Sequence, residues 1–421
     1  MPYPDVLIVG GGLAGLSCAG KLHRSGHSFL LLDAGDRVGG RVRTDTVDGF
    51  TLDRGFQVLL TAYPETKRAF DYDALDLHPF HDGALVRYDG AFHRISDPFR
   101  HPFTAPSTLM APIGTLADKL RVGGLRLRLL RDDLSTVFTR EETTTIDALR
   151  HRWKFSDRMI DRFFRPFFGG IFFDTALQAS SRMFEFVFKM FAEGQAALPA
   201  AGIEALPRQL ADSLPPESIQ SNTTVTSIDG QYVQLADGRT LEAPAVVVAT
   251  DAPNAQSLIH DIHPTGARST TSLYYAAENS PLDAPLLVLN GDGEGPINNL
   301  CVPSDVAPSY APGGRALISV VVVGDPSVPD DALEQHVRHQ LADWFGPSVE
   351  LWDHLHTVRI PYALPEQRPP FLSPPDRPIR RRAGLYVCGD HRYTASLNGA
   401  IGSGRAAADA VLNDLPALTP A

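Results

Sequence analysis

The sequence predicts an α/β fold in which a sheet of parallel strands is interrupted by a second, α+β region. The chain opens with an apolar run, a glycine-rich turn and a helical pattern, all within residues 5–33. Apolar runs typical of buried strands return much later, at residues 245–250 and 385–388. Between them, residues 153–192 carry phenylalanines at helical spacing, and the opening pattern stops. We therefore expect one sheet to be built from distant parts of the chain.

The opening segment has the layout of a Rossmann-like dinucleotide fingerprint. Gly10 permits a tight turn, Gly12 lets a pyrophosphate approach the backbone, and Gly15 lets the following helix pack close to the strand. The helix N-terminus offers free N–H groups and partial positive charge to phosphates, and the acid at the end of the next strand can accept ribose hydroxyls. In order, the segment contains the apolar residues 6–9, Gly10, Gly12, Leu13, Ala14, Gly15, the apolar residues 29–32 and Asp33.

Two further motifs carry a resemblance to a known family. The first joins Asp33 and Ala34 to the run at residues 37–41, which includes Gly39, Gly40 and Arg41. The second lies near the other end, at residues 384–390 and 396–404. Together they resemble the superfamily of FAD-dependent amine oxidases, phytoene desaturases and protoporphyrinogen oxidases. The resemblance is strong at both ends and loose in the middle of the chain.

The resemblance implies FAD as the cofactor and suggests where it binds. Arg41 would lie beside the pyrophosphate, and Val225 would meet the adenine through its backbone. Residues 51–60 would pass near the isoalloxazine, where Asp53 and Gln57 could orient polar groups; the alternative is that these two residues belong to a turn at the end of a strand. Asp390 would accept the ribityl hydroxyls, and the helix starting near Leu397 would face the flavin pyrimidine. The residues expected to bind FAD are Gly10, Gly12, Leu13, Ala14, Gly15, Asp33, Ala34, Gly39, Gly40, Arg41, Gly55, Phe56, Gln57, Val225, Thr250, Gly389, Asp390, Leu397, Asn398, Gly399 and Ala400.

Composition narrows the class of protein. A chain of 421 residues, 43% hydrophobic and 21% charged, is expected to form about two soluble globular domains. The net charge of -11 argues against nucleic acid as a partner. Cys18, Cys301 and Cys388 are too far apart to suggest a disulfide framework or a metal site. With no signal peptide or membrane span expected, a reducing cytoplasm is the default location.

The predicted domain plan is discontinuous. We assign residues 1–83, 200–264 and 356–421 to an FAD-binding domain, and residues 84–199 and 265–355 to an α+β substrate domain. Within the latter, we expect a hairpin at residues 84–95, strands at residues 269–276 and 316–323, and a helix at residues 331–345. The basic residues within 116–131 favour a surface helix with solvated arginines; the alternative is a peripheral membrane contact near a substrate entrance.

The phenylalanines of residues 153–192 have two interpretations. They can pack a helical core, or some of them can line an apolar substrate cavity, as the resemblance implies for this region. For the second interpretation we name Phe167, Phe172, Phe184 and Phe188 as substrate-binding residues.

Missing residues also bear on function. Residues 359–365 lack the cysteine to which some amine oxidases attach FAD, so non-covalent binding is expected. No lysine follows residues 250–253, where many amine oxidases hold a water beside the flavin. Asn398 replaces a glutamate that many relatives have. His391, Arg392 and Tyr393 are the candidates for catalysis, and the sequence identifies no catalytic residue among them.

These observations lead to a prediction of function and to alternatives. We expect an FAD-dependent oxidoreductase that transfers a hydride from a substrate C–H to flavin N5, acting as a desaturase or dehydrogenase on a lipophilic, isoprenoid- or carotenoid-like small molecule. Dioxygen or a quinone would accept the electrons. The alternatives are an amine or protoporphyrinogen oxidase using dioxygen, a non-redox flavoprotein isomerase, and a carrier of this fold that has lost its flavin.

Overall fold

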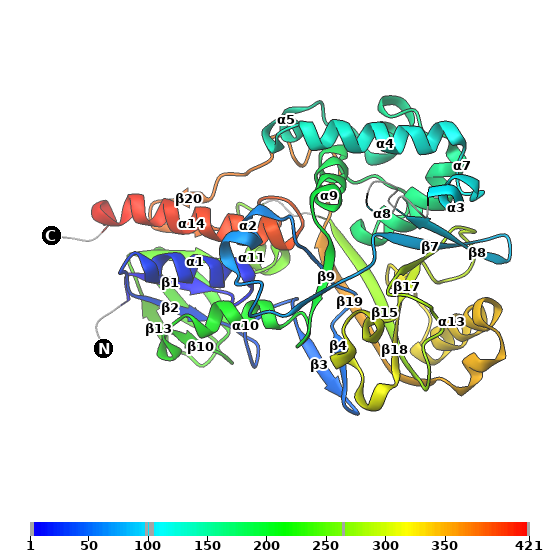
Figure 1. The fold of residues 1–421 in the computed structure, drawn as a ribbon. Coiled ribbons are helices and arrows are strands. Elements are labelled where there is room, and N and C mark those ends of the chain that lie inside the picture. The colour runs from blue at the N-terminus through cyan, green and yellow to red at the C-terminus, as the bar shows by residue number, and fades with distance from the viewer. Residues whose placement is uncertain (1–3, 97–99, 101–104, 263–265, 419–421) are drawn as a thin grey trace.

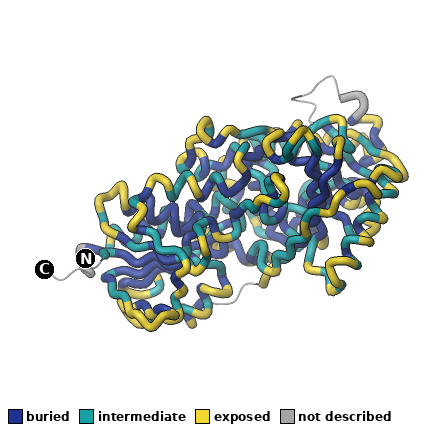
Figure 2. Tube along the Cα trace, turned by 90° about the horizontal axis from the view of Figure 1, so that it is seen from below, coloured by how far each residue is buried: buried dark blue, intermediate teal, exposed yellow. Residues whose placement is uncertain are grey.

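The structure is a computed structural model and describes residues 4–96, 100, 105–262 and 266–418. It has two main sheets at opposite ends of an elongated molecule, joined by segments that pass between them several times (Figure 1). Buried residues run through both ends, while exposed residues follow the outer turns and helix faces (Figure 2). A mixed α/β fold is therefore confirmed.

The first sheet joins distant parts of the chain. Val6 is paired in parallel with Phe29 on one side and with Ala245 on the other. Because successive side chains alternate between the faces of a strand, Val6 and Ile8 pack with α1 and α14. Leu7 and Val9 pack on the opposite face against a small antiparallel sheet. The strand order is β10 (Ile219–Gln220), β2 (Phe29–Leu32), β1 (Val6–Val9), β14 (Ala245–Val248), β21 (Leu385–Val387) and the antiparallel β20 (Arg380–Arg382).

The helices and small sheet around this first sheet also come from several segments. α1 and α14 pack side by side, as Figure 1 shows. The elements are α1 (Leu13–Arg24), α10 (Ala205–Asp212), α11 (Ala252–Leu258), α14 (Leu397–Leu418), β11 (Val225–Asp229), β12 (Tyr232–Leu235) and β13 (Thr240–Glu242).

The second sheet contains the predicted hairpin and strands. Asp89 and Gly90 form the tight hairpin turn with φ of 50° and 73°. One face of the sheet packs on α13 (Asp330–Phe345), which covers the predicted helix. The strand order is β19 (Asp353–Pro365), β15 (Ala267–Ala277), β18 (Ala316–Val323), β17 (Asn299–Cys301), β16 (Leu287–Asn290), β7 (Gly83–Tyr88) and β8 (Ala91–Ser96).

The strand β19 spans one predicted domain boundary. We placed the return to the first domain at residue 356, yet β19 stays hydrogen-bonded to β15 through Pro365. The reason is that residues 353–365 form one continuous strand, which the sequence analysis did not recognise. The division into two domains itself stays a prediction.

Small sheets connect the two ends. β3 (Thr44–Val47) pairs with β4 (Phe50–Asp53), and β9 (Ala196–Pro199) lies between β5 (Leu59–Leu60) and β6 (Leu77–Pro79). The segment between α2 (Pro64–Ala69) and β9 is helical beyond the hairpin. Its main helices are α3 (Ala105–Met110), α4 (Leu116–Arg131), α5 (Leu134–Thr139), α8 (Arg165–Phe172) and α9 (Ser181–Glu193). Among the described residues, no helix is both long enough and apolar enough to cross a bilayer.

Candidate functional site

A cavity of about 1120 Å³ connects the first sheet to the helical segment. One end is formed by the glycine turn after β1 and by the residues that follow β2, β14 and β21. The other end is formed by α8, α9 and the edge strand β19. Polar and apolar ends therefore belong to one continuous space, which is large enough for a bulky ligand.

The glycine turn is close-packed except where it meets the cavity. Gly10 has φ of 110°, and a Cβ there would lie 2.9 Å from the carbonyl of Ala249. A Cβ on Gly15 would lie 1.9 Å from the Gly10 carbonyl oxygen, so only glycine allows the helix to approach this closely. At Gly12, the N-cap of α1, a Cβ would meet nothing within 4 Å. The first N–H groups of α1, which have no intrahelical acceptor, lie at this opening.

Asp33 holds the glycine turn and faces the same end of the cavity. Its Oδ2 accepts a hydrogen bond from the Gly11 N–H at 2.6 Å, and its Oδ1 accepts one from the Gly35 N–H at 2.7 Å. Each carboxylate oxygen keeps a second lone pair. Asp33 can therefore fix the turn and accept ligand hydroxyls at the same time.

Two segments far apart in the sequence meet at the cavity wall: residues 39–41, two glycines and an arginine, and residues 389–390, a glycine and an aspartate. The Gly39 N–H donates to the Gly11 carbonyl at 2.9 Å, which joins the second motif to the glycine turn. Arg41 donates through Nη2 to Asp390 at 2.7 Å and through Nη1 to the Ala363 carbonyl at 2.7 Å. Asp390 is buried, so this ion pair crosses from the first motif to the closing motif inside the protein.

Most of the predicted cofactor residues line the cavity, and three do not. Gly15 is enclosed by the turn, Asn398 accepts a hydrogen bond from the Glu65 N–H at 2.9 Å, and a Cβ on Gly399 would lie 1.9 Å from the Thr394 carbonyl oxygen. The lining residues are Gly10, Gly12, Leu13, Ala14, Asp33, Ala34, Gly39, Gly40, Arg41, Gly55, Phe56, Gln57, Val225, Thr250, Gly389, Asp390, Leu397 and Ala400.

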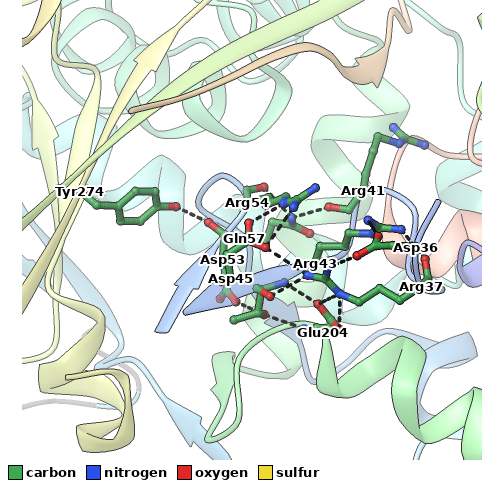
Figure 3. A network of polar contacts seen from close by, with 11 residues as sticks. Asp36, Arg37, Arg41, Arg43, Asp45, Asp53, Arg54, Gln57, Glu204 and Tyr274 are labelled. Atoms are coloured by element: carbon green, nitrogen blue, oxygen red, sulfur yellow. Dashed lines mark hydrogen bonds and ion pairs between the residues drawn. The ribbon is translucent and has the colours of Figure 1, made fainter. Parts of the chain in front are cut away.

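Behind the cavity, a polar network fixes the segment between β2 and β4 (Figure 3). Arg37 donates to Glu204 at 2.9 Å and to Asp45 at 3.1 Å, and Arg54 also donates to Asp45. Gln57 Nε2 donates to the Arg41 carbonyl at 3.0 Å. The network holds Arg41 and its neighbours in place at the cavity wall.

Asp53, which the family resemblance implied to lie near a flavin, has a structural role. It is buried, and its carboxylate accepts hydrogen bonds from Thr44 Oγ1 at 2.6 Å, the Ile203 N–H at 2.8 Å and Tyr310 O–H at 2.8 Å. Burial raises the pKa of Asp53 to about 6. Tyr274 donates to the Asp53 carbonyl, so this residue ties β4 to the second sheet.

None of the three catalytic candidates lines the cavity. His391 is 1% exposed, and its ring lies 2.6 Å from where a Cβ on Gly389 would be. Neither ring nitrogen has a hydrogen-bond partner among the described residues, and burial lowers the pKa of His391 to about 4. Arg392 donates to the Pro378 carbonyl at 2.7 Å, and the Tyr393 carbonyl accepts from Gln367 at 2.9 Å. All three lie behind the closing motif.

The phenylalanine-rich segment serves both as core and as cavity wall. Phe167 lines the cavity, but Phe172, Phe184 and Phe188 do not. Phe184 is fully buried, with its ring centroid 4.8 Å from that of Phe168. The sequence analysis missed other side chains on this wall: Leu60, Tyr63, Ile171, Phe173, Met183, Val187, Phe191 and Tyr362.

One group of the missed cavity residues could have been recognised from its spacing in the sequence. Met183, Val187 and Phe191 are four residues apart, so they share one face of α9, and that face lines the cavity. The sequence analysis instead selected Phe184 and Phe188 from the same helix, and neither is among the residues that line the cavity. Tyr63 and Tyr362 carried no such signal, because their place depends on contacts between distant segments.

The described residues contain no cluster of His, Cys, Asp and Glu able to hold a metal ion. The cavity carboxylates are Asp33, Asp45, Asp251 and Asp390, and all come from the end that carries the glycine turn or from β3. The arrangement therefore offers phosphate- and hydroxyl-binding groups at one end and apolar side chains at the other.

Comparisons with known proteins agree with this arrangement. The model of the family described as flavin-containing amine oxidoreductase matches residues 13–412. Polyamine oxidase 2 of Arabidopsis thaliana is 42% identical over 52 residues, and 4,4'-diapolycopene oxygenase of Methylomonas sp. is 44% identical over 54 residues. These segments cover 12% and 13% of this chain and 11% of each relative.

The fold is similar to that of a solved putrescine oxidase bound to putrescine. The TM-score is 0.72 at 15% identity, with 98% of this chain and 99% of that chain covered. At this identity the similarity extends to the fold alone.

Proposed function

Because the chain belongs to the flavin-containing amine oxidoreductase family, we propose that it binds FAD non-covalently and acts as a desaturase or dehydrogenase of a lipophilic small molecule. Membership makes it a flavin-dependent oxidoreductase; the identity of the flavin and of the substrate is our proposal. The observation that carries it is a continuous cavity with a polar, glycine-lined end and an apolar end.

The polar end fits a dinucleotide. The open side of Gly12 and the N-terminus of α1 would hold the pyrophosphate, with Arg41 close by. The free lone pairs of Asp33 would accept ribose hydroxyls, and the backbone of Val225 would meet the adenine. Asp390, already fixed by Arg41, would accept ribityl hydroxyls. No cysteine occurs in residues 359–365, which supports non-covalent binding.

A bound flavin would supply the two-electron acceptor that takes a hydride from a substrate C–H at N5. The chain would position the substrate and exclude water from it. Phe167, Ile171 and Phe191 form an apolar surface at the far end of the cavity. Such contacts hold an apolar molecule by burying its surface, and no hydrogen bonds are needed.

The placement of charge favours a neutral substrate over an amine. An ammonium group in a buried site needs a carboxylate or an aromatic cage. Each cavity carboxylate of the described residues lies outside the apolar wall, and Asp45 and Asp390 are already paired with arginines. An isoprenoid- or carotenoid-like substrate, with dioxygen or a quinone as electron acceptor, fits this distribution best.

A second function is favoured by one observation. A segment of this chain is similar to polyamine oxidase 2, and the cavity wall includes Tyr63, whose aromatic ring could contact a cation; the ring of Tyr362 already lies 5.4 Å from the Arg41 guanidinium. Oxidation of an amine by dioxygen is therefore the alternative to test first.

Anaerobic flavin reduction tests the proposal. Purified protein is mixed with an acyclic isoprenoid polyene in detergent micelles or with putrescine, and flavin absorbance is followed. We expect the polyene to bleach the flavin and putrescine to leave it oxidised. Bleaching by putrescine alone would replace the proposed substrate class with an amine.

A further inference from the structure

Exposed large hydrophobic side chains are concentrated on one part of the surface. Among the described residues they are Leu109 (48% exposed), Met110 (85%), Leu116 (62%), Leu120 (70%), Leu127 (45%), Tyr232 (45%) and Leu351 (83%). The first five belong to α3 and α4. We call this group the α3–α4 patch. Single exposed apolar residues are ordinary, but a contiguous group marks an interaction surface.

The leucines of the patch form one ridge on α4. At about 100° per residue, Leu120 and Leu127 lie within about 40° of Leu116 around the helix axis. Leu125 and Leu129 lie on the opposite side, at roughly 180° and 220° from Leu116. Both are buried, whereas the three ridge leucines are exposed. The ridge therefore points away from the body of the protein.

The end of α3 extends this ridge. Lys119 Nζ donates to the Leu109 carbonyl at 2.6 Å and to the Ala111 carbonyl at 2.7 Å. These bonds hold Leu109 and Met110 against the first turns of α4. The patch is thus a fixed part of the fold.

Positive charge flanks the ridge. Arg121, Arg128 and Arg131 lie on one side of it, at about 60° to 140° from Leu116, and Lys119 and Arg126 lie on the other. The acidic residue of α4, Asp118, is buried; it accepts hydrogen bonds from Thr115 and Ser156 and is paired with Arg121 at 3.1 Å. Arg128 is paired with Asp132, just after the helix, at 3.3 Å. Lys119 and Arg126 keep their charge but donate to backbone carbonyls. With five basic residues against Asp118 and Asp132, the region around the ridge is still net cationic, although the whole chain has a net charge of -11.

We propose that the α3–α4 patch docks on the surface of an anionic lipid bilayer. An apolar ridge bordered by cations matches such a surface, where side chains enter the acyl boundary and arginines meet the headgroups. A second copy of this chain fits less well, because two-fold pairing of ridges would bring like-charged arginines together. α4 lies along the outer edge of the molecule, where a planar surface can reach it (Figure 1).

The patch is one helix away from the cavity. Lys189 of α9 donates through Nζ to the Leu129 carbonyl of α4 at 2.8 Å, and Arg126 of α4 donates to the Ala192 carbonyl of α9 at 3.2 Å. The face of α9 that carries Met183 and Val187 lines the cavity. Docking would thus place the cavity wall next to a bilayer; that this bilayer delivers the substrate rests on the proposed function.

Vesicle binding tests the proposal. Full-length protein is sedimented with phosphatidylcholine vesicles, with or without phosphatidylglycerol, at low and high salt. We expect binding to the anionic vesicles that weakens with salt. Leu116→Asp/Leu120→Asp should lower the partition coefficient about a hundredfold or more, because two apolar side chains are replaced by charges that anionic headgroups repel. Arg121→Glu/Arg128→Glu should lower binding to anionic vesicles.

Leu351→Asp is the control, because Leu351, at 83%, is more exposed than Leu116 (62%) and Leu120 (70%) but lies outside the patch. It should bind vesicles as the wild type does. Absence of wild-type binding, an unaffected Leu116→Asp/Leu120→Asp variant, or equal loss in Leu351→Asp would overturn the proposal. A dimer in sedimentation velocity that only the patch variant abolishes, without vesicle binding, would assign the patch to a second copy.

The test is independent of flavin chemistry. Flavin content and bleaching by a substrate dissolved in detergent should be the same in Leu116→Asp/Leu120→Asp and in the wild type. A protein that does not bind vesicles would therefore contradict the docking of the α3–α4 patch but not the proposed function. A protein whose flavin is not bleached would contradict the proposed function but not the docking.

Discussion

Replacing Asp33 with alanine should weaken FAD binding about ten- to a hundredfold. The change removes a charged acceptor from the ribose hydroxyls, and hydrogen bonds to charged groups contribute roughly 1.5–3 kcal/mol. It also leaves the Gly11 and Gly35 N–H groups without the carboxylate that holds them at 2.6 and 2.7 Å. Both effects act on the cofactor end of the cavity and leave the two sheets intact.

The assay is a fluorescence titration of apoprotein with FAD. Asp33→Asn is the informative partner, because it keeps one acceptor oxygen but sets an amide donor against a backbone N–H. We expect its affinity to be lower than that of the wild type. Asp237→Ala, in an exposed turn between β12 and β13, is the control and should bind FAD normally. An unchanged Kd in a folded Asp33→Ala protein would refute the reasoning.

Three further predictions concern the core, pH and the cofactor linkage. Phe184→Ala should lower the free energy of unfolding by about 3–5 kcal/mol, because Phe184 is fully buried, while Phe167→Ala at the cavity wall should lower it less; chemical denaturation with equal losses would contradict the division of roles. Because burial lowers the pKa of His391 to about 4, the unfolded chain takes up a proton first as pH falls below 6.5, and stability is lost down to about pH 4. The His391→Phe variant should lose less stability than the wild type over that range. Urea titrations at pH 7 and pH 5 measure this, and an equal loss of unfolding free energy in the two proteins would show that His391 does not cause the pH dependence. Acid precipitation should release intact FAD into the supernatant, and flavin retained on the protein would show a covalent link.

The sequence was sufficient to predict those elements that are determined by residues close together in the chain. The glycine spacing, the apolar run at β1 and the acid Asp33 reflect a single strand–turn–helix unit, so the sequence is sufficient to recognise them. The hairpin β7–β8 was found for the same reason, since its turn residues adopt positive φ. Gly123 and Gly124 would weaken an isolated helix, yet α4 continues through them, because Leu125 and Leu129 pack against the protein.

Features that depend on distant contacts were not predictable. β19 is an edge strand because it pairs with β15, almost ninety residues earlier, and its own pattern is irregular. Asp53 looked like a site residue, but Thr44, Ile203 and Tyr310 converge on it only in the folded chain. The four-residue spacing of Met183, Val187 and Phe191 could have marked one shared face of α9, but that this face meets the cavity depends on where the helix packs.

A double substitution in the apolar wall tests most directly whether the cavity has separate cofactor and substrate ends. Phe167→Ala/Phe191→Ala is measured for FAD affinity and for the rate of anaerobic flavin bleaching by an isoprenoid polyene. Each truncated side chain removes about 1.5–3 kcal/mol of apolar contact, so bleaching at low substrate should slow at least about tenfold. FAD affinity should stay within about twofold of the wild type, since both rings lie beyond the glycine end. Unchanged bleaching, or a parallel loss of FAD affinity, would contradict an apolar substrate end distinct from the cofactor end.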